Sequence, residues 1–154
     1  MLAIIAAAVA LLCSGPILAQ MPAPPADQVP PPAKRAGHVQ IVKGPALEIA
    51  HDDIAIIRWT TNNPGGDDDH YAVAHYGTDP KDLSETAKNH IRLNRTHAET
   101  IFRVRIDGLK PQTTYYYEVT SMGAGGHSDG EESAVSRFTT PGPGQVTSAF
   151  PPPE

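Results

Sequence analysis

The sequence has a single cysteine, Cys13, so no disulfide can form within the chain and a disulfide framework is excluded. Basic side chains form no stripe, and the formal net charge is −5, so the electrostatic footprint of a nucleic-acid-binding protein is missing. No apolar run reaches the roughly 20 residues that a comfortable transmembrane helix needs. With 40% hydrophobic and 19% charged residues, the composition is that of a soluble globular protein.

Proline is scarce in the middle of the chain and dense at both ends: 12 of the 16 prolines lie outside residues 33–140. Dense proline fixes φ, removes backbone donors and extends the chain as polyproline II. We therefore expect a Pro-rich linker over residues 20–36, one folded domain over 37–141 and a disordered Pro/Gly-rich tail over 142–154.

Residues 1–19 predict a secretory signal peptide. Apolar residues run from Leu2 to Leu12, a Ser-Gly-Pro break follows, and cleavage after Ala19 suits the small residue there. No Lys or Arg precedes the apolar run, so an uncleaved anchor stays open as an alternative. Lipidation of Cys13 is a second alternative, although the two leucines before it do not suit a lipoprotein site. Cleavage predicts a secreted or periplasmic protein with no stable membrane span.

The middle of the chain reads as short strands separated by turns. Residues 99–106 alternate strictly, with Phe102, Val104 and Ile106 on one face and two arginines on the other. The other stretches with strand character are 53–61, 70–77, 113–121 and 133–140. No stretch keeps a helical period, although residues 80–89 could form one helical turn. The pattern predicts an all-β, seven-stranded sandwich over about residues 38–140.

Three consecutive tyrosines, Tyr115 to Tyr117, lie in one of these stretches. Successive side chains of a strand point to opposite faces, so Tyr115 and Tyr117 share the face that ends in Val119. That face is the natural core face. Two rings should therefore point inward, and Tyr116 should point outward, where it could contact a partner.

The stretch Leu109 to Tyr115, LKPQTTY, resembles the fibronectin type III signature Leu-x-Pro-x-Thr-x-Tyr. The resemblance implies an immunoglobulin-like sandwich in which the hydroxyl of Tyr115 bonds to upstream backbone, the arrangement called a tyrosine corner. Trp59 resembles the strand B tryptophan of that fold. The residues expected to point inward are Trp59, Ile57, Phe102, Val104, Ile106, Leu109, Tyr115, Tyr117, Val119 and Phe138.

More narrowly, IIRWTT, AHYGT, GLKPQTTYYYEV and SRFTTP resemble the fibronectin-type domain that precedes the catalytic domain of purple acid phosphatases. For the strand at 70–77, this resemblance puts Ala72, Ala74 and Tyr76 inside. Tyr71 and Val73 are nevertheless the larger apolar pair, so the opposite register stays open.

Purple acid phosphatases hold two metals through Asp, Tyr, Asn and His ligands on a separate α/β domain. The chain ends at Glu154, about 13 residues past the expected sandwich. Residues 66–71 (GDDDHY) place His70 where the family has Tyr, and residues 125–129 (GGHSD) place Asp129 where it has a second His. We therefore expect no catalytic, cofactor-binding or metal-binding residues and a chain that is not an enzyme.

Other candidate sites have plainer explanations. The acidic turn Asp67-Asp68-Asp69 could collect Ca²⁺, but a solvated acidic turn is the preferred interpretation. His70 and His75 lie five apart on one strand and face opposite sides, so they cannot share a metal. Asn94 begins a glycosylation sequon. Arg58, Arg103 and Arg105 could form cross-strand ion pairs, Glu118 among their partners, on the outer faces.

Two hypotheses for function follow. The first is an exported, non-catalytic module for binding, adhesion or spacing, with an unidentified extracytoplasmic protein or carbohydrate as partner. The second is a detached or truncated accessory domain of a metallophosphatase that acts on a catalytic domain in trans.

Overall fold

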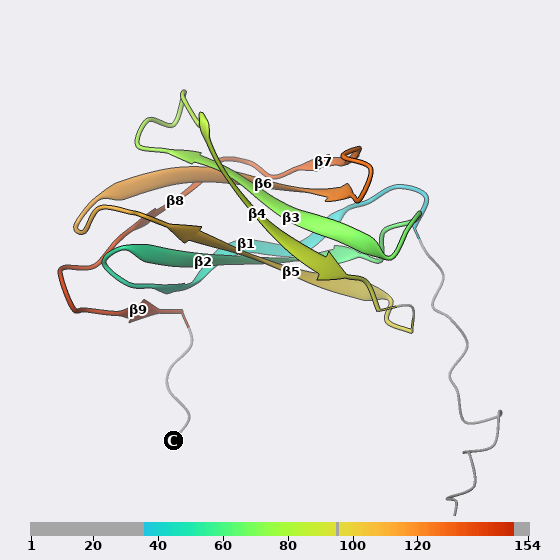
Figure 1. Ribbon diagram of the computed structural model, residues 1–154, viewed down its shortest axis with the longest axis horizontal. Coiled ribbons are helices and arrows are strands. Elements are labelled where there is room, and N and C mark those ends of the chain that lie inside the picture. The colour runs from blue at the N-terminus through green and yellow to red at the C-terminus, as the bar shows by residue number, and fades with distance from the viewer. Residues whose placement is uncertain (1–35, 95, 150–154) are drawn as a thin grey trace, which may run out of the picture. The chain divides into compact units, whose positions relative to one another are not determined.

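The computed structural model describes residues 36–94 and 96–149, which form two β-sheets packed face to face (Figure 1). The expected signal peptide with Cys13, the linker up to residue 35 and residues 150–154 lie outside the described residues. No helix long and apolar enough to cross a membrane occurs in the described ranges.

The described residues contain nine strands. In chain order they are β1 Ile41–Ala50, β2 Ile54–Asn62, β3 Asp69–Gly77, β4 Glu85–Arg92, β5 Glu99–Asp107, β6 Thr114–Gly123, β7 Ser128–Glu132, β8 Ser136–Thr139 and β9 Thr147–Ser148. One sheet has the order β5-β2-β1-β9. The other has the order β4-β3-β6-β7, and β8 pairs with the same strand β6.

The predicted all-β sandwich is confirmed, but the number of strands differs from seven. β7 lies where the sequence predicted a loop, and β9 lies where it predicted a tail. β7 pairs with the second half of β6 and β8 with the first half, so one interrupted strand runs along this edge of the sheet. Residues 80–89, considered for a helical turn, instead lead into β4.

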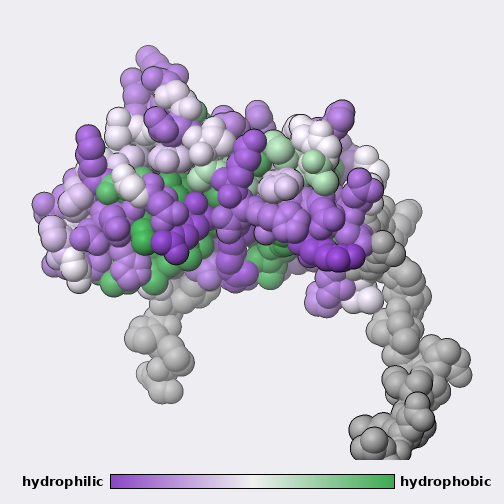
Figure 2. All heavy atoms as spheres, in the orientation of Figure 1, coloured by the Kyte–Doolittle hydropathy of each residue, from purple (hydrophilic) through white to green (hydrophobic). Residues whose placement is uncertain are grey.

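The core lies between the sheets and is built by the alternation in β2, β5 and β6. All ten residues expected to point inward are buried. Trp59 stacks on Phe102 with ring centroids 5.4 Å apart, and Tyr115 stacks on Phe138 at 5.8 Å. Outward-facing side chains are mostly hydrophilic on the face shown in Figure 2.

β3 takes the register that the family resemblance implied. Ala72 and Ala74 belong to the core cluster, and Tyr76 packs against it. Val73 is also fully buried, although it points to the opposite face of the sheet, whereas Tyr71 is only partly buried. Both faces of β3 are therefore covered at its centre, which explains why the sequence pattern favoured neither register clearly.

The tyrosine corner is present. The hydroxyl oxygen of Tyr115 accepts a hydrogen bond of 2.9 Å from the backbone N–H of Lys110. The bond ties the turn before β6 to the first buried ring of that strand. The confirmed corner fixes the entry of β6 into the core.

Replacing Tyr115 with phenylalanine should lower the free energy of unfolding by about 1–3 kcal/mol, because the N–H of Lys110 loses its partner in a part-buried position. Denaturant midpoints of the variant and the parent measure the effect. Tyr116→Phe is the matched control, since it removes the same hydroxyl from the outer face. Equal midpoints for Tyr115→Phe and the parent would contradict a stabilising corner.

Burial raises the pKa of Tyr117, and a hydrogen bond with Ser136 partly opposes that effect. The pKa of Tyr76 is also raised, first by burial and then by the nearby Glu85, Tyr115 and Asp107. Both phenols hold their protons more tightly in the folded state than in the unfolded chain, where the pKa is near 10.0.

The raised pKa values of the two tyrosines contribute fully to the free energy of unfolding below about pH 10. This contribution is lost as the pH rises through the folded-state pKa values, because the unfolded chain then releases its protons first. We expect the denaturant midpoint to fall above about pH 10, and to fall less steeply in Tyr117→Phe. A midpoint independent of pH between about 9 and 11 would contradict the expectation.

Candidate functional site

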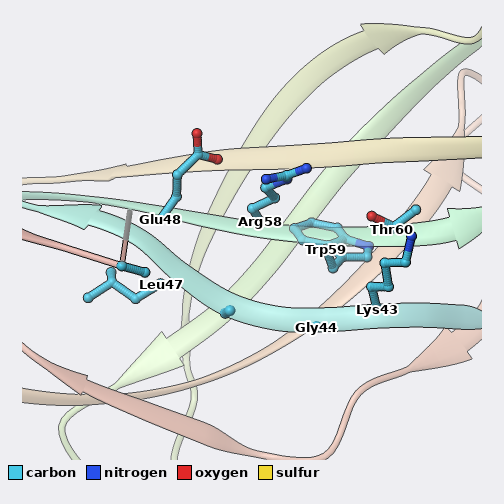
Figure 3. Close-up of a pocket in the computed structure, with 9 residues that line it drawn as sticks. Lys43, Gly44, Leu47, Glu48, Arg58, Trp59 and Thr60 are labelled. Atoms are coloured by element: carbon cyan, nitrogen blue, oxygen red, sulfur yellow. The ribbon is translucent and has the colours of Figure 1, made fainter. Parts of the chain in front are cut away.

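A pocket of about 210 Å³ opens where β1 departs from regular pairing with β2 (Figure 3). Lys43 pairs with Thr60, but the next pair along β1 is Ala46 with Arg58, so β1 carries an extra residue in this interval. Two further irregularities flank this interval, one between Ile41 and Lys43 and one between Leu47 and Ile49. β-bulges of this kind bend a strand and re-aim its side chains. The pocket is thus a product of irregular pairing.

Gly44 brings the backbone of β1 against β2 at one end of the pocket. Its φ is +82°, a left-handed value that residues other than glycine rarely adopt. A Cβ at this position would lie 2.9 Å from the carbonyl oxygen of Arg58 and 3.2 Å from the Cα of Trp59. Only glycine therefore permits this approach without a shift of the strands.

The pocket combines an apolar wall with a charged rim. The apolar lining residues are Ala46, Leu47, Trp59 and Ala149. The charged ones are Lys43, Glu48 and Arg58. β5, which lies beyond β2 in the same sheet, holds two of these charged groups in place. Glu48 Oε2 lies 2.7 Å from Nε of Arg103, and Lys43 Nζ lies 3.5 Å from Oε2 of Glu99.

The indole nitrogen of Trp59 is the unusual polar atom of the pocket. The Trp59 residue is 1% exposed, and its Nε1 has no hydrogen-bond partner among the described residues. In Figure 3 this nitrogen is on the side of the indole toward Lys43 and Thr60. An indole N–H only donates, and buried donors are normally paired. The N–H of Trp59 is therefore a buried donor beside the pocket, without an acceptor among the described residues.

β9 closes one side of the pocket. Two atoms donate to the carbonyl oxygen of Glu48: the backbone N–H of Ala149 at 3.1 Å and the hydroxyl of Ser148 at 3.4 Å. Residues 142–149 were predicted to be a disordered tail; instead they turn back and pair with β1. Two residues of strand are too few for alternation to show in a sequence, so this wall was missed.

The two stretches that partly match phosphatase metal motifs do meet in space. His70 Nε2 lies 3.4 Å from Oδ1 of Asp129, and the hydroxyl of Ser121 donates to Oδ2 of the same carboxylate. Nucleophilic catalysis needs the hydroxyl against the imidazole, whereas here the carboxylate separates the two. The cluster holds β7 against β3 and β6. His70 Nδ1 is buried and has no partner in the described part of the chain.

The remaining candidate residues are spread over the surface. His70 and His75 face opposite sides of β3, as expected, and Nδ1 of His75 contacts the hydroxyl of Thr86 at 3.1 Å. Asp69 pairs with His90 at 3.2 Å. The described ranges contain no group of three His, Cys, Asp or Glu residues placed to hold a metal ion.

Arg103 and Arg105 form ion pairs, but not with Glu118, the partner expected from the sequence. Arg103 pairs with Glu48, and Arg105 Nε lies 2.6 Å from Oδ1 of Asp107. Glu118 lies on β6 in the other sheet. Asn94 is exposed, and its side-chain oxygen accepts hydrogen bonds from the N–H and hydroxyl of Thr96. Its glycosylation stays a prediction.

A two-sheet sandwich with a buried tryptophan on β2 and a tyrosine corner before β6 defines a fibronectin type III-like domain. The family model described as "Purple acid Phosphatase, N-terminal domain" matches residues 43–140. The chain belongs to this family. The match ends just after β8, and its description concerns the N-terminal domain of those enzymes.

Comparison with solved structures finds distant likenesses. The sensor domain of the anti-sigma factor RsgI4 in Pseudobacteroides cellulosolvens is 20% identical, with a TM-score of 0.48 over 68% of this chain and 95% of that chain. The third fibronectin III domain of human KIAA0343 protein is 15% identical, with a TM-score of 0.35 over 74% of this chain and 86% of that one. A search of the curated proteins gave no match.

Proposed function

We propose that this chain is an exported, non-catalytic binding module whose contact site is the pocket between β1, β2 and β9. The observation that carries the proposal is a pocket whose rim holds Lys43, Arg58 and Glu48, beside the N–H of Trp59, which has no partner among the described residues. The family supports it, because the matched segment is the domain that accompanies the catalytic part of purple acid phosphatases. Residues 20–36 would serve as an extended tether outside the cytoplasm.

The pocket chemistry favours a small carboxylate with an apolar body. The indole N–H and the Lys43 ammonium donate to an anionic oxygen, and Leu47 with the alanines covers the apolar part. A volume of about 210 Å³ is smaller than most drug-sized sites, so it suits one side chain or a terminal group of a larger partner.

Fluorescence tests this proposal directly, because Trp59 is the only tryptophan of the chain. Titration with N-acetyl-leucine should change the emission saturably, whereas N-acetyl-leucine amide, which lacks the carboxylate, should not. Lys43→Met should weaken the response, and Lys110→Met is the control for losing an exposed cation elsewhere. Identical responses to the acid and the amide would refute the assignment of the ligand.

Export has its own test. Mass spectrometry of the protein recovered outside the cytoplasm should find an N-terminus near Gln20. A full-length chain retained in the cytoplasm would refute export while leaving the pocket untouched.

The second candidate function is that of an accessory domain for a metallophosphatase, which the family match favours. A metallophosphatase domain encoded in the adjoining reading frame would support this alternative. A change in the activity of that domain when this chain is added in trans would establish it. Phosphatase activity of the purified chain alone, with Fe, Zn or Mn, would overturn the non-catalytic assignment.

A further inference from the structure

β4 is an open edge of its sheet. It is the end strand of the order β4-β3-β6-β7, and among the described residues it pairs with β3 alone (Figure 1). The pairing is regular along all of β4, from Tyr76 with Glu85 to Asp69 with Arg92. An unpaired strand edge presents a row of backbone donors and acceptors to an added strand.

The usual backbone devices that protect such an edge are missing from β4. Its sequence, ETAKNHIR, has no proline or glycine, and its register with β3 shows no bulge. β1, in the other sheet, differs: it contains Pro45 and three irregularities of register. β4 can therefore accept a complete strand along its length, and only its side chains decide which strand fits.

Those side chains are basic on the outer face. Ala74 and Ala87 pair on the core face, so Lys88, His90 and Arg92 share the opposite face; we call these three residues the basic edge. All three are exposed. Within the described ranges neither Lys88 nor Arg92 has an ion-pair partner, and the one carboxylate in contact with the basic edge, that of Asp69, lies 3.2 Å from Nε2 of His90.

Three cations of the other sheet differ from the basic edge. Lys43, Arg103 and Arg105 each form an ion pair with an acid of the chain. The chain as a whole carries a formal net charge of −5. Two cations without an ion-pair partner among the described residues, on the end strand of a sheet in an acidic protein, are complementary to an acidic strand from elsewhere.

A second copy of the chain does not satisfy this edge. Antiparallel pairing of β4 with its own copy, with the outer faces kept on one side, places even-numbered residues opposite even-numbered ones. Lys88, His90 and Arg92 of the two copies would then face each other, and like charges directly opposite are destabilising.

We propose that β4 binds an extended acidic peptide segment of a partner protein by strand addition. The added strand hydrogen-bonds to the free edge and places carboxylates opposite Lys88 and Arg92. These residues are four apart on one face, about 13 Å along the strand. The recognised segment therefore carries acidic residues at positions i and i+4. This surface is separate from the pocket near Trp59.

The test uses the full chain and two fluorescently labelled nine-residue peptides of serine and threonine. One has glutamates at positions 3 and 7, which share a face in a strand; the control has them at positions 3 and 6, which do not. Fluorescence anisotropy should show tighter binding of the first peptide, by up to about fivefold for one additional ion pair. N-methylation of alternate amides on one edge should abolish binding, because it removes the backbone donors.

Variants locate the binding surface. The double variant Lys88→Glu, Arg92→Glu should lose at least about tenfold in affinity, since two attractions become repulsions. Arg105→Glu makes the same kind of change on the end strand of the other sheet and should keep parental affinity. Far-UV circular dichroism and Trp59 emission establish that each variant is folded.

Several outcomes would overturn the proposal. Equal binding of the two peptides, undiminished binding of the N-methylated peptide or unchanged affinity of the double variant would each do so. No binding at low salt would have the same consequence. A dimer in sedimentation velocity whose affinity Lys88→Glu changes, and which the acidic peptide does not dissociate, would assign the edge to a second copy instead.

Discussion

Replacing Tyr117 with alanine should lower the free energy of unfolding by about 3–5 kcal/mol. The residue is 2% exposed, and its ring lies 5.8 Å from that of Phe138. Alanine leaves a cavity at the centre of β6, bordered by β3 and β8, that rigid sheets fill poorly. A domain of this size has only about 5–15 kcal/mol in total, so the variant should be close to unfolded at room temperature.

Tyr116→Ala is the matched control, because it removes the same side chain one residue away. Tyr116 is on the outer face of β6 and only partly buried, so its loss should change the free energy of unfolding by less than about 1 kcal/mol. Denaturant midpoints of the two variants and the parent give the order directly. If Tyr116→Ala were the more damaging change, the assignment of faces in β6 would be reversed.

The core could be predicted because burial leaves a period of two in the sequence. β5 and β6 each present one face to the core, and their alternation identified Phe102 and Tyr117 as inward residues. Trp59 was identified by its resemblance to the strand B tryptophan of the fold. The tyrosine corner was predictable for another reason: a short turn motif places Tyr115 at a fixed distance from Lys110.

The edges of the sheets could not be predicted in this way. β4 buries little on either face, so its composition resembles that of a loop, and β7 consists of SDGEE. Each becomes a strand because a well-defined neighbour, β3 or β6, offers it a backbone to pair with. Pairing of this kind depends on tertiary structure and leaves no local pattern.

The pocket was hidden for a related reason. Its walls come from β1, β2 and β9, and its space arises from residues of β1 that have no counterpart on β2. A Gly-Pro pair inside a strand pattern is the one local signal of such a bulge. The unpaired nitrogen of Trp59 could be recognised only once its surroundings were known.

Replacing Gly44 with alanine should lower the free energy of unfolding by about 2–4 kcal/mol, the sum of an unfavourable backbone conformation and a collision with β2. The new Cβ would lie 2.9 Å from the carbonyl oxygen of Arg58, and a backbone atom paired in a sheet cannot easily move. Gly66→Ala separates the two effects. Gly66 has the same φ of +82°, but a Cβ there would meet no atom within 4 Å. That control should therefore cost only about 1–2 kcal/mol, for the backbone conformation alone.

Denaturant midpoints measure both changes, and Trp59 reports on the first one locally, because its Cα lies 3.2 Å from the position of the added Cβ. Gly44→Ala should shift the emission of Trp59 in the folded state and weaken its response to N-acetyl-leucine, since separating β1 from β2 reshapes the pocket. Gly66→Ala should leave both unchanged. If the two variants were equally stable and bound N-acetyl-leucine alike, β1 would be free to move away from β2. The close approach at Gly44 would then not be what shapes the pocket.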